Sequence, residues 1–333
     1  MNYIGSKYKL SSFIKDTIHS VAGNDLSNKV FCDLFAGTGI IGRVFKKEVK
    51  QVISNDIEYY SYVLNRNYIG NHIKLSFETL LNRLNNLSPI KDGFIYNNYC
   101  MGSGGKRQYF SDSNGKKIDA VRKQIDIWFK NKEINNNMYF FLLSCLLEAV
   151  DKVANTASVY GAFLKNLKKT ALKDLILKPA LFDINANTHK VFQADSNDLI
   201  NKISGDILYL DPPYNERQYG ANYHLLNTVA KYDDFTPKGK TGLRDYIRSN
   251  YCIRKNVRQE FEYIIKQSKF KYIFLSYNNE GLMTIDEIKS ILSKYGHYDM
   301  VKKKYQRFKA DKTDNRNHKA DFTYEFLHIV EKK

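Results

Sequence analysis

Apolar residues near the start of the chain follow two spacings, one typical of helices and one typical of buried strands. Residues 10–22 place Leu, Phe, Ile and Val at helical intervals, which predicts an amphipathic helix. The apolar run 30–35 predicts a strand, and helical spacing resumes at Ile40 after a turn rich in glycine. A second strand at 51–56 and a helix at 59–67 follow, which suits one crossover between parallel strands.

The pattern changes between residues 72 and 180, where a polar, aromatic-rich stretch with several glycines precedes two long helical patterns. Strand patterns then return, with helical spacing between the second and the third; they lie at residues 189–195, 206–214, 271–278 and 324–330. This order predicts a doubly wound α/β domain, made of residues 1–71 and 181–333, with an inserted, mainly helical domain at 72–180.

Composition is that of an ordinary globular chain: 333 residues, 43% hydrophobic and 26% charged, enough for about two domains. No apolar run is long enough to cross a membrane and the first residues do not form a secretory signal, so we expect a cytoplasmic protein with no membrane partner. The four cysteines are scattered without a C-x-x-C pair, which favours reduced, buried thiols and predicts no metal site; they are Cys32, Cys100, Cys145 and Cys252.

Charge departs from the average. Lys and Arg number 52 against 35 Asp and Glu, a net charge of +17 that attracts polyanions, and nucleic acid is the leading partner. The alternative is a generally basic protein from an AT-rich genome.

A glycine turn follows the first predicted strand. Gly37, Gly39 and Gly42 fit G-x-G-x-x-G, a spacing that lets the backbone approach a nucleotide-like ligand at the start of a helix. Asp56 ends the second strand, where an acid accepts hydrogen bonds from ribose hydroxyls. NAD, FAD and S-adenosylmethionine are not separated by this pattern, and Asp56 could instead cap the next helix.

A second turn, Asp211-Pro212-Pro213-Tyr214, follows the apolar strand 207–210. The two prolines end the strand and stiffen the turn, which leaves a carboxylate and a phenol ring side by side at its carboxyl end. An aromatic face there can stack on a base while the carboxylate accepts from an exocyclic amine. A proline-terminated strand with a buried tyrosine is the alternative.

These motifs resemble those of a known family. The DPPY turn is similar to the catalytic motif of S-adenosylmethionine-dependent DNA adenine N6-methyltransferases, and DLFAGTG, beginning at Asp33, resembles their cofactor loop. NYIGSK, residues 2–7, is similar to the motif that opens the alpha, or D12, class. The order of the motifs agrees over essentially the whole chain. The resemblance implies a Rossmann-like methyltransferase sheet with a helical DNA-recognition domain, in a bacterial type II restriction-modification system.

The resemblance also implies how S-adenosylmethionine is held. Tyr3 and Lys7 would contact the cofactor, with Lys7 near its methionine carboxylate, and Asp33, Gly37 and Gly39 would form its loop. Asp56 would hold the ribose hydroxyls. Asp195 would lie near the adenine ring, with a turn or helix cap as the alternative.

The resemblance also implies how the target base is held. Asp211 and the Pro212 carbonyl would bind its amino group, within the stiff turn that Pro213 completes. Tyr214 would stack on the flipped adenine. No covalent intermediate is expected, since no cysteine follows a proline as a cytosine C5 enzyme requires. His224 is a conceivable general base, but it is more typical of a DNA or structural contact.

Four segments combine basic, amide and aromatic side chains suited to phosphates and base edges: the loop after DPPY and residues 106–117, 155–170 and 239–258. The alternative is a solvated charged face. The predicted DNA contacts are Lys106, Arg107, Tyr109, Arg217, Tyr219, Asn222, Lys240 and Arg244.

The main hypothesis is therefore a monomer that methylates adenine N6 in a short site of double-stranded DNA, associates with the nucleoid through DNA, and shares a system with a restriction endonuclease without binding it. The resemblance makes a palindrome such as CATG conceivable as the site. Alternatives are an RNA or protein-glutamine amino methyltransferase, a DNA-binding module without catalysis, and an NAD oxidoreductase, which would give DPPY no task.

Overall fold

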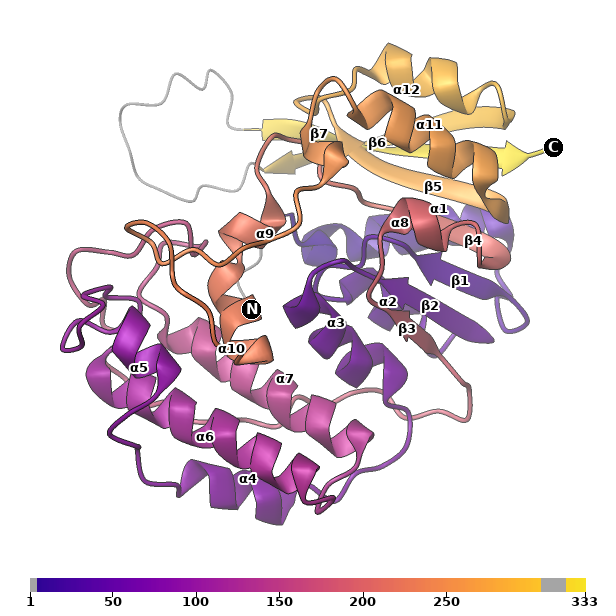
Figure 1. Ribbon diagram of the computed structural model, residues 1–333. Coiled ribbons are helices and arrows are strands. Elements are labelled where there is room, and N and C mark those ends of the chain that lie inside the picture. Colours follow the sequence, from indigo (N-terminus) through magenta and orange to yellow (C-terminus); the bar gives the residue numbers. More distant parts are fainter. Residues whose placement is uncertain (1–4, 307–321) are drawn as a thin grey trace. The chain divides into compact units, whose positions relative to one another are not determined.

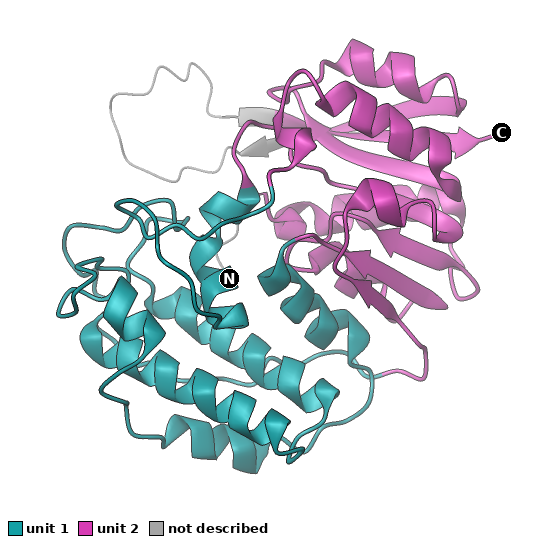
Figure 2. Ribbon diagram, viewed as in Figure 1, with its two compact units in different colours: residues 1–4, 58–184, 219–247 teal, residues 5–57, 185–218, 248–333 magenta. Residues whose placement is uncertain are grey.

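The computed structural model describes residues 5–306 and 322–333 of the chain (Figure 1). These residues form two compact units, which Figure 2 shows in different colours. The sheet unit comprises the described residues of Gly5–Ile57, Asn185–Gln218 and Arg248–Lys333. The helical unit comprises residues 58–184 and Tyr219–Ile247. Each unit is thus assembled from segments far apart in the sequence.

The sheet unit is built on one seven-stranded sheet with the order β3-β2-β1-β4-β5-β7-β6. Neighbouring strands from β3 to β5 are parallel, whereas β7 is antiparallel to both β5 and β6. The strands are β1 Val30–Asp33, β2 Gln51–Asn55, β3 Lys190–Phe192, β4 Ser204–Leu210, β5 Lys269–Asn278, β6 Gly296–Gln306 and β7 Phe322–Lys332. The chain runs outward from β1 to β3 and then returns to the other side of β1 as β4. The carboxyl ends of β1 and β4 therefore flank a topological switch point, where such sheets bind ligands.

Helices cover both faces of this sheet. Successive side chains of a strand point to opposite faces, so neighbouring residues of β1 pack against different helices. Phe31 stacks on Phe45 of helix α2 with ring centroids 4.4 Å apart. Its neighbour Cys32 belongs instead to a core cluster that includes Ile264 of α11 and Ile288 of α12, two helices that lie side by side in Figure 1. The helices of this unit are η1 Lys7–Leu10, α1 Ser11–Ala22, α2 Ile40–Phe45, α8 Ser196–Leu199, η3 Asn250–Cys252, α11 Val257–Gln267 and α12 Ile285–Leu292. The predicted doubly wound, Rossmann-like α/β fold is confirmed.

The predicted strands all exist, although several bounds differ by a few residues. The run 206–214 forms a strand only as far as Leu210, because the two prolines that follow cannot extend the ladder. β6 was not predicted. Its sequence, GHYDMVKKKYQ, is too polar to resemble a buried strand, and it is held in the sheet by its antiparallel ladder to β7.

The helical unit has one continuous apolar core, which includes residues of its two longest helices, α6 and α7. Each of these helices begins at a side-chain cap: Ser111 accepts from the Asn114 amide at 3.3 Å, and Asn135 from the Met138 amide at 3.0 Å. The helices are α3 Tyr59–Asn65, the π-helix η2 Arg66–Gly70, α4 Glu78–Asn85, α5 Phe94–Tyr99, α6 Asp112–Lys130, α7 Asn136–Val153, α9 Tyr219–Asn222 and α10 His224–Lys231. Within the described ranges, no helix combines the length and apolarity needed to span a membrane.

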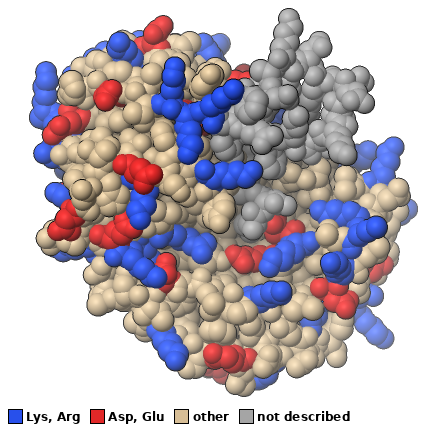
Figure 3. Space-filling model, turned by 180° about the vertical axis from the view of Figure 1, so that it is seen from behind, with Lys and Arg blue, Asp and Glu red and all other residues tan. Residues whose placement is uncertain are grey.

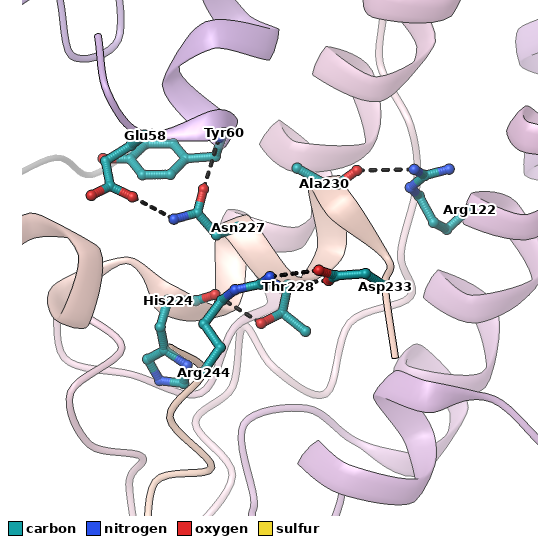
Figure 4. A network of polar contacts seen from close by, with 9 residues as sticks. All are labelled: Glu58, Tyr60, Arg122, His224, Asn227, Thr228, Ala230, Asp233 and Arg244. Carbon is teal, nitrogen blue, oxygen red and sulfur yellow. Dashed lines mark hydrogen bonds and ion pairs between the residues drawn. The ribbon is translucent and has the colours of Figure 1, made fainter. Parts of the chain in front are cut away.

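Polar contacts tie α10 to this unit, although it lies outside the block 72–180 (Figure 4). The Asn227 amide donates to Glu58 and accepts from the backbone amide of Tyr60 at 2.9 Å. Arg122 of α6, fully buried, donates to the Val229 and Ala230 carbonyls at the end of α10, at 3.0 and 2.9 Å. The compact unit is therefore wider than the predicted block, since it starts at Glu58 and includes residues 219–247.

Candidate active site

The glycine turn joins β1 to α2 and is bound to the end of β2. Gly37 and Gly39 have φ angles of 52° and 76°, a region that favours glycine. The Gly37 amide donates to Asp56 Oδ2 at 2.8 Å, and the Ala36 amide donates to the Asn55 carbonyl at 2.9 Å. Asp56 therefore holds the turn and does not cap α3, whose N-cap position is Glu58.

Asp33 is the last residue of β1 and is buried, with 2% of its surface exposed. Its Oδ2 accepts from the Gly42 amide at 3.2 Å, while its Oδ1 makes no hydrogen bond to the described residues. Burial, together with the nearby charge of Asp211, raises the pKa of Asp33 to about 8. This carboxyl group therefore holds a proton more tightly than an exposed aspartate does.

The DPPY turn starts directly after β4, on the strand beside β1. The register pairs Asp33 with Tyr209, so Asp33 and Asp211 lie at the carboxyl ends of neighbouring strands. The Tyr214 carbonyl accepts from the Leu282 amide at 2.9 Å, and the Tyr214 ring meets Tyr277 edge to face at a centroid distance of 5.9 Å. The turn is thus ordered on both its polar and its aromatic side.

Lys7 places a buried positive charge beside this turn. Its Nζ lies 2.8 Å from Asp211 Oδ1 and 3.2 Å from Glu325 Oε1, and 5.5 Å from the centre of the Tyr214 ring. Burial lowers the pKa of Lys7, but the two carboxylates outweigh burial and hold it well above its usual value. Burial raises the pKa of Asp211 to about 6, while Lys7 opposes that rise and Glu325 adds to it.

Glu325 was missed by the sequence reasoning. It is an acid in the apolar strand pattern YEFLHIV, and a buried acid needs a partner. That requirement was the available signal, but the partner, Lys7, lies at the other end of the sequence.

Two other residues, Asp195 and Tyr3, were predicted to contact the cofactor. Asp195 is exposed and caps α8, accepting from the Asn197 amide at 2.8 Å, and Tyr3 lies outside the described residues.

Lys106, Lys240 and Arg217 are exposed, as a DNA contact requires. In the helical unit, the half-buried Arg107 donates to the carbonyls of Asn98 and Gly239 at 3.1 and 3.2 Å. Arg107 therefore joins the loop of Lys106 to the loop of Lys240. Lys and Arg side chains also spread over much of the face drawn in Figure 3, with Asp and Glu in smaller groups among them.

Tyr109 and Arg244 are not surface groups, so the structure does not bring them to the predicted DNA contact. Tyr109 is fully buried and donates to the Tyr160 carbonyl at 2.6 Å. Arg244 is 7% exposed and forms two hydrogen bonds to Asp233, at 3.0 and 2.8 Å (Figure 4). Their side chains could bind DNA chemically, but both form hydrogen bonds within the helical unit instead.

His224 and the short helix α9 are also partly structural. His224 is fully buried, its Nε2 lies 3.0 Å from the Tyr160 carbonyl, and burial lowers its pKa to about 4. A neutral histidine bonded to a backbone carbonyl favours the structural interpretation. Tyr219 stacks on Tyr223 at 6.0 Å, and the Asn222 carbonyl accepts from the Tyr160 amide at 2.8 Å. Both Tyr219 and Asn222 remain half-exposed.

A doubly wound sheet that presents a glycine turn and a DPPY turn on adjacent strands at its switch point defines a Rossmann-like class of ligand-binding protein. Comparison with known families narrows this class. The family model for the D12 class N6 adenine-specific DNA methyltransferases matches residues 3–291, and the chain belongs to this family.

Individual relatives agree with the family. The chain is 65% identical to the type II methyltransferase M.NlaIII of Neisseria lactamica, over all of this chain and 99% of that protein. It is 38% identical to M.CviAII of Paramecium bursaria Chlorella virus 1, with 93% of each chain covered. It is also 38% identical to M.FokI of Planomicrobium okeanokoites, of which it spans 53%.

The acids at the switch point fit the cofactor of this class. Methyltransferases of the D12 class depend on S-adenosylmethionine, which has a positively charged sulfonium, an ammonium group and a ribose diol. The buried Asp33 Oδ1 lacks a partner among the described residues, and buried polar atoms are rarely left so. Asp33 and Asp56, beside a turn with two positive-φ glycines, supply the acceptors that such a ligand needs.

Proposed function

We propose that this protein transfers a methyl group from S-adenosylmethionine to the N6 amine of adenine at a specific site in double-stranded DNA. The position of Asp211, at the end of β4 and next to the glycine turn of β1, is the observation that carries this proposal. Family membership supports the same chemistry.

In this proposal Asp211 and the Pro212 carbonyl accept the hydrogens of the target amine. The lone pair of an exocyclic amine is delocalised into the purine ring, and acceptors aimed at its hydrogens favour the tetrahedral geometry that attacks. With a pKa of about 6, Asp211 is mostly ionised at neutral pH and is therefore an acceptor. When the N6–methyl bond forms and the bond to sulfur breaks, one N6 proton must leave, and the Asp211 carboxylate is suited to receive it.

Orientation supplies much of the remaining catalysis. The cofactor supplies a methyl group that is already electrophilic. Residues of the chain hold the two reactants in line, an effect worth up to about 7 to 11 kcal/mol in favourable cases. We assign the cofactor loop to Asp33, Gly37 and Gly39 and the ribose hydroxyls to Asp56, with further cofactor contacts from Tyr3, Lys7 and Asp195.

The target adenine must leave the DNA stack to reach Asp211, which costs a few kcal/mol. We assign the stacking surface to Tyr214, whose ring is half-exposed and oriented by Tyr277. Pro213 stiffens the turn between the acid and the ring.

We assign sequence recognition to the inserted block 72–180 and phosphate contacts to exposed basic residues. The exposed basic residues to which we assign phosphate contacts are Lys106 and Lys240 of the helical unit and Arg217 of the sheet unit. We further propose that the protein acts as a monomer in the bacterial cytoplasm and protects host DNA from a restriction endonuclease that it does not bind.

Expression in a host free of DNA methylation, followed by genome-wide mapping of modified bases by single-molecule sequencing, tests this function. The expected result is N6-methyladenine at one position of one short sequence, with CATG as the first sequence to inspect. Absence of modified adenine, with active purified protein methylating RNA or a protein glutamine instead, would overturn the proposal.

A further inference from the structure

We infer that Glu325 is a positioning residue for the methyl transfer: by sharing the Lys7 ammonium with Asp211, it keeps Asp211 able to accept a hydrogen bond from the target amine. This inference rests on the proposed function of Asp211. Glu325 itself is not expected to touch the cofactor or the base.

Two donors from different elements fix the Glu325 carboxylate. Glu325 lies in β7, opposite Asn278 of β5, and only 4% of its surface is exposed. Its Oε1 accepts from Ser276 Oγ of β5 at 3.2 Å and lies 3.2 Å from Lys7 Nζ. A carboxylate held in this way has little freedom to move, so it sets the place of the ammonium.

Lys7 is consequently held by two carboxylates at once, at 2.8 Å from Asp211, whose side chain is 16% exposed, and at 3.2 Å from the buried Glu325. Burial leaves little water in this site to screen the charges. An ammonium group shared between two carboxylates therefore binds each of them less strongly than it would bind a single carboxylate. Without Glu325, the full charge of Lys7 would bind Asp211. That tighter ion pair would compete with the amine for the oxygens of Asp211.

The surroundings of Asp211 determine the sign of the expected pH effect. Glu325 raises the pKa of Asp211 and Lys7 lowers it. Asp211 is active when ionised, so removing the charge of Glu325 should move the acid limb of the rate profile to lower pH. Asp33 of β1 and Tyr209 of β4 also interact electrostatically with Asp211, and the Tyr214 ring lies near Lys7; all three stay in place in the variants below.

The test compares Glu325→Gln with the matched control Glu331→Gln, an exposed acid on the same strand that pairs with Lys271 at 3.3 Å. Single-turnover methylation of duplex DNA is measured against pH, with cofactor affinity and melting temperature measured in parallel. For Glu325→Gln we expect a rate lower by about tenfold or more, the size of one charge-assisted hydrogen bond. We also expect an acid limb at lower pH and unchanged KM for DNA. Glu325→Asp should recover part of the rate, and Glu331→Gln should match the wild type.

A second variant decides the matter if Glu325→Gln does not fold. Ser276→Ala removes one donor to Glu325, which then draws Lys7 away from Asp211 and should move the acid limb to higher pH, opposite to the shift for Glu325→Gln. An acid limb at the wild-type pH in every variant that folds, or a lower melting temperature with no change in rate, would overturn the inference. If the wild type itself does not methylate adenine, the proposed function fails instead, and the two failures are thereby distinguished.

Discussion

Asp33 ends β1 and Asp211 directly follows the neighbouring parallel strand β4, and burial together with the charge of Asp211 raises the pKa of Asp33 to about 8. Asp211, with a pKa of about 6, is the stronger acid of the two. Different surroundings produce this difference, since Asp211 has the Lys7 ammonium at 2.8 Å and Asp33 has a backbone amide.

Replacing Asp211 with Ala should abolish most turnover and leave cofactor binding intact. One preorganised partner of the reacting amine is lost, which predicts a rate lower by about 100- to 1,000-fold. Lys7 keeps Glu325 as a partner, so folding should be retained. Single-turnover transfer of labelled methyl groups and calorimetric cofactor titration provide the measurements. Turnover close to that of the wild type would show that Asp211 has another role.

The methylation rate should decline as the pH falls through about 6, the pKa of Asp211, because only the ionised carboxylate accepts from the amine. Below that pH the rate should drop about tenfold per pH unit. A profile of kcat/KM for DNA against pH, which reports the pKa of the unbound enzyme, measures it. A profile that stays level to below about pH 5 would contradict an ionised Asp211 as the acceptor.

Asp33→Asn should stabilise the protein in the absence of cofactor. The pKa of Asp33 rises from 3.8 to about 8 on folding, so the folded state binds a proton that the unfolded state releases between those values. Wild-type stability should therefore fall by up to about 1.4 kcal/mol per pH unit as pH rises across that window, and the Asn variant should escape this loss. Urea unfolding at several pH values measures the difference.

In the same experiment Asp33→Ala should be less stable than Asp33→Asn at every pH, since it lacks an acceptor for the Gly42 amide. A stability gap between Asp33→Asn and the wild type that does not widen with pH would show that Asp33 stays ionised on folding.

Lys106→Ala and Lys240→Ala should weaken DNA binding and make it less dependent on salt. Each lysine that neutralises one phosphate contributes about one unit to the slope of log affinity against log salt. Lys132→Ala is the matched control, because Lys132 lies beyond the far end of α6 from Lys106, a helix about 28 Å long. Fluorescence anisotropy at several salt concentrations measures the slopes. If the slope of log affinity against log salt were the same in all three variants, Lys106 and Lys240 would not contact DNA phosphates.

Arg122→Met should destabilise the protein by about 3 kcal/mol, because the carbonyls of Val229 and Ala230 at the end of α10 lose their buried donor. Lys123→Met, the exposed neighbour on α6, should change stability by less than about 0.5 kcal/mol. Chemical denaturation compares the two. Similar losses in both variants would mean that the contacts drawn in Figure 4 contribute little.

The sequence predicted those parts of the fold in which local chemistry and tertiary position agree. The run before Asp33, the glycines after it and the prolines after Asp211 each determine their own backbone, so both turns were predicted correctly. β6 was missed because a sheet can hold a polar strand by backbone pairing alone, which leaves no apolar pattern to detect.

Site residues were harder to predict wherever a partner is distant in the sequence. Tyr109 looked like a base contact, but its hydroxyl bonds a carbonyl 51 positions away in the core. Glu325 has its ammonium partner at the opposite end of the chain. Residue type and spacing cannot reveal such pairs, because the fold alone brings them together.

The ladder between β1 and β4 aligns the glycine turn with Asp211 through main-chain bonds, which depend little on side-chain identity. Substitutions confined to residues 58–184 leave that ladder untouched. If residues 72–180 recognise the DNA sequence, as we propose, a lineage could acquire a new recognition sequence by substitutions in these helices while its reaction chemistry is inherited unaltered.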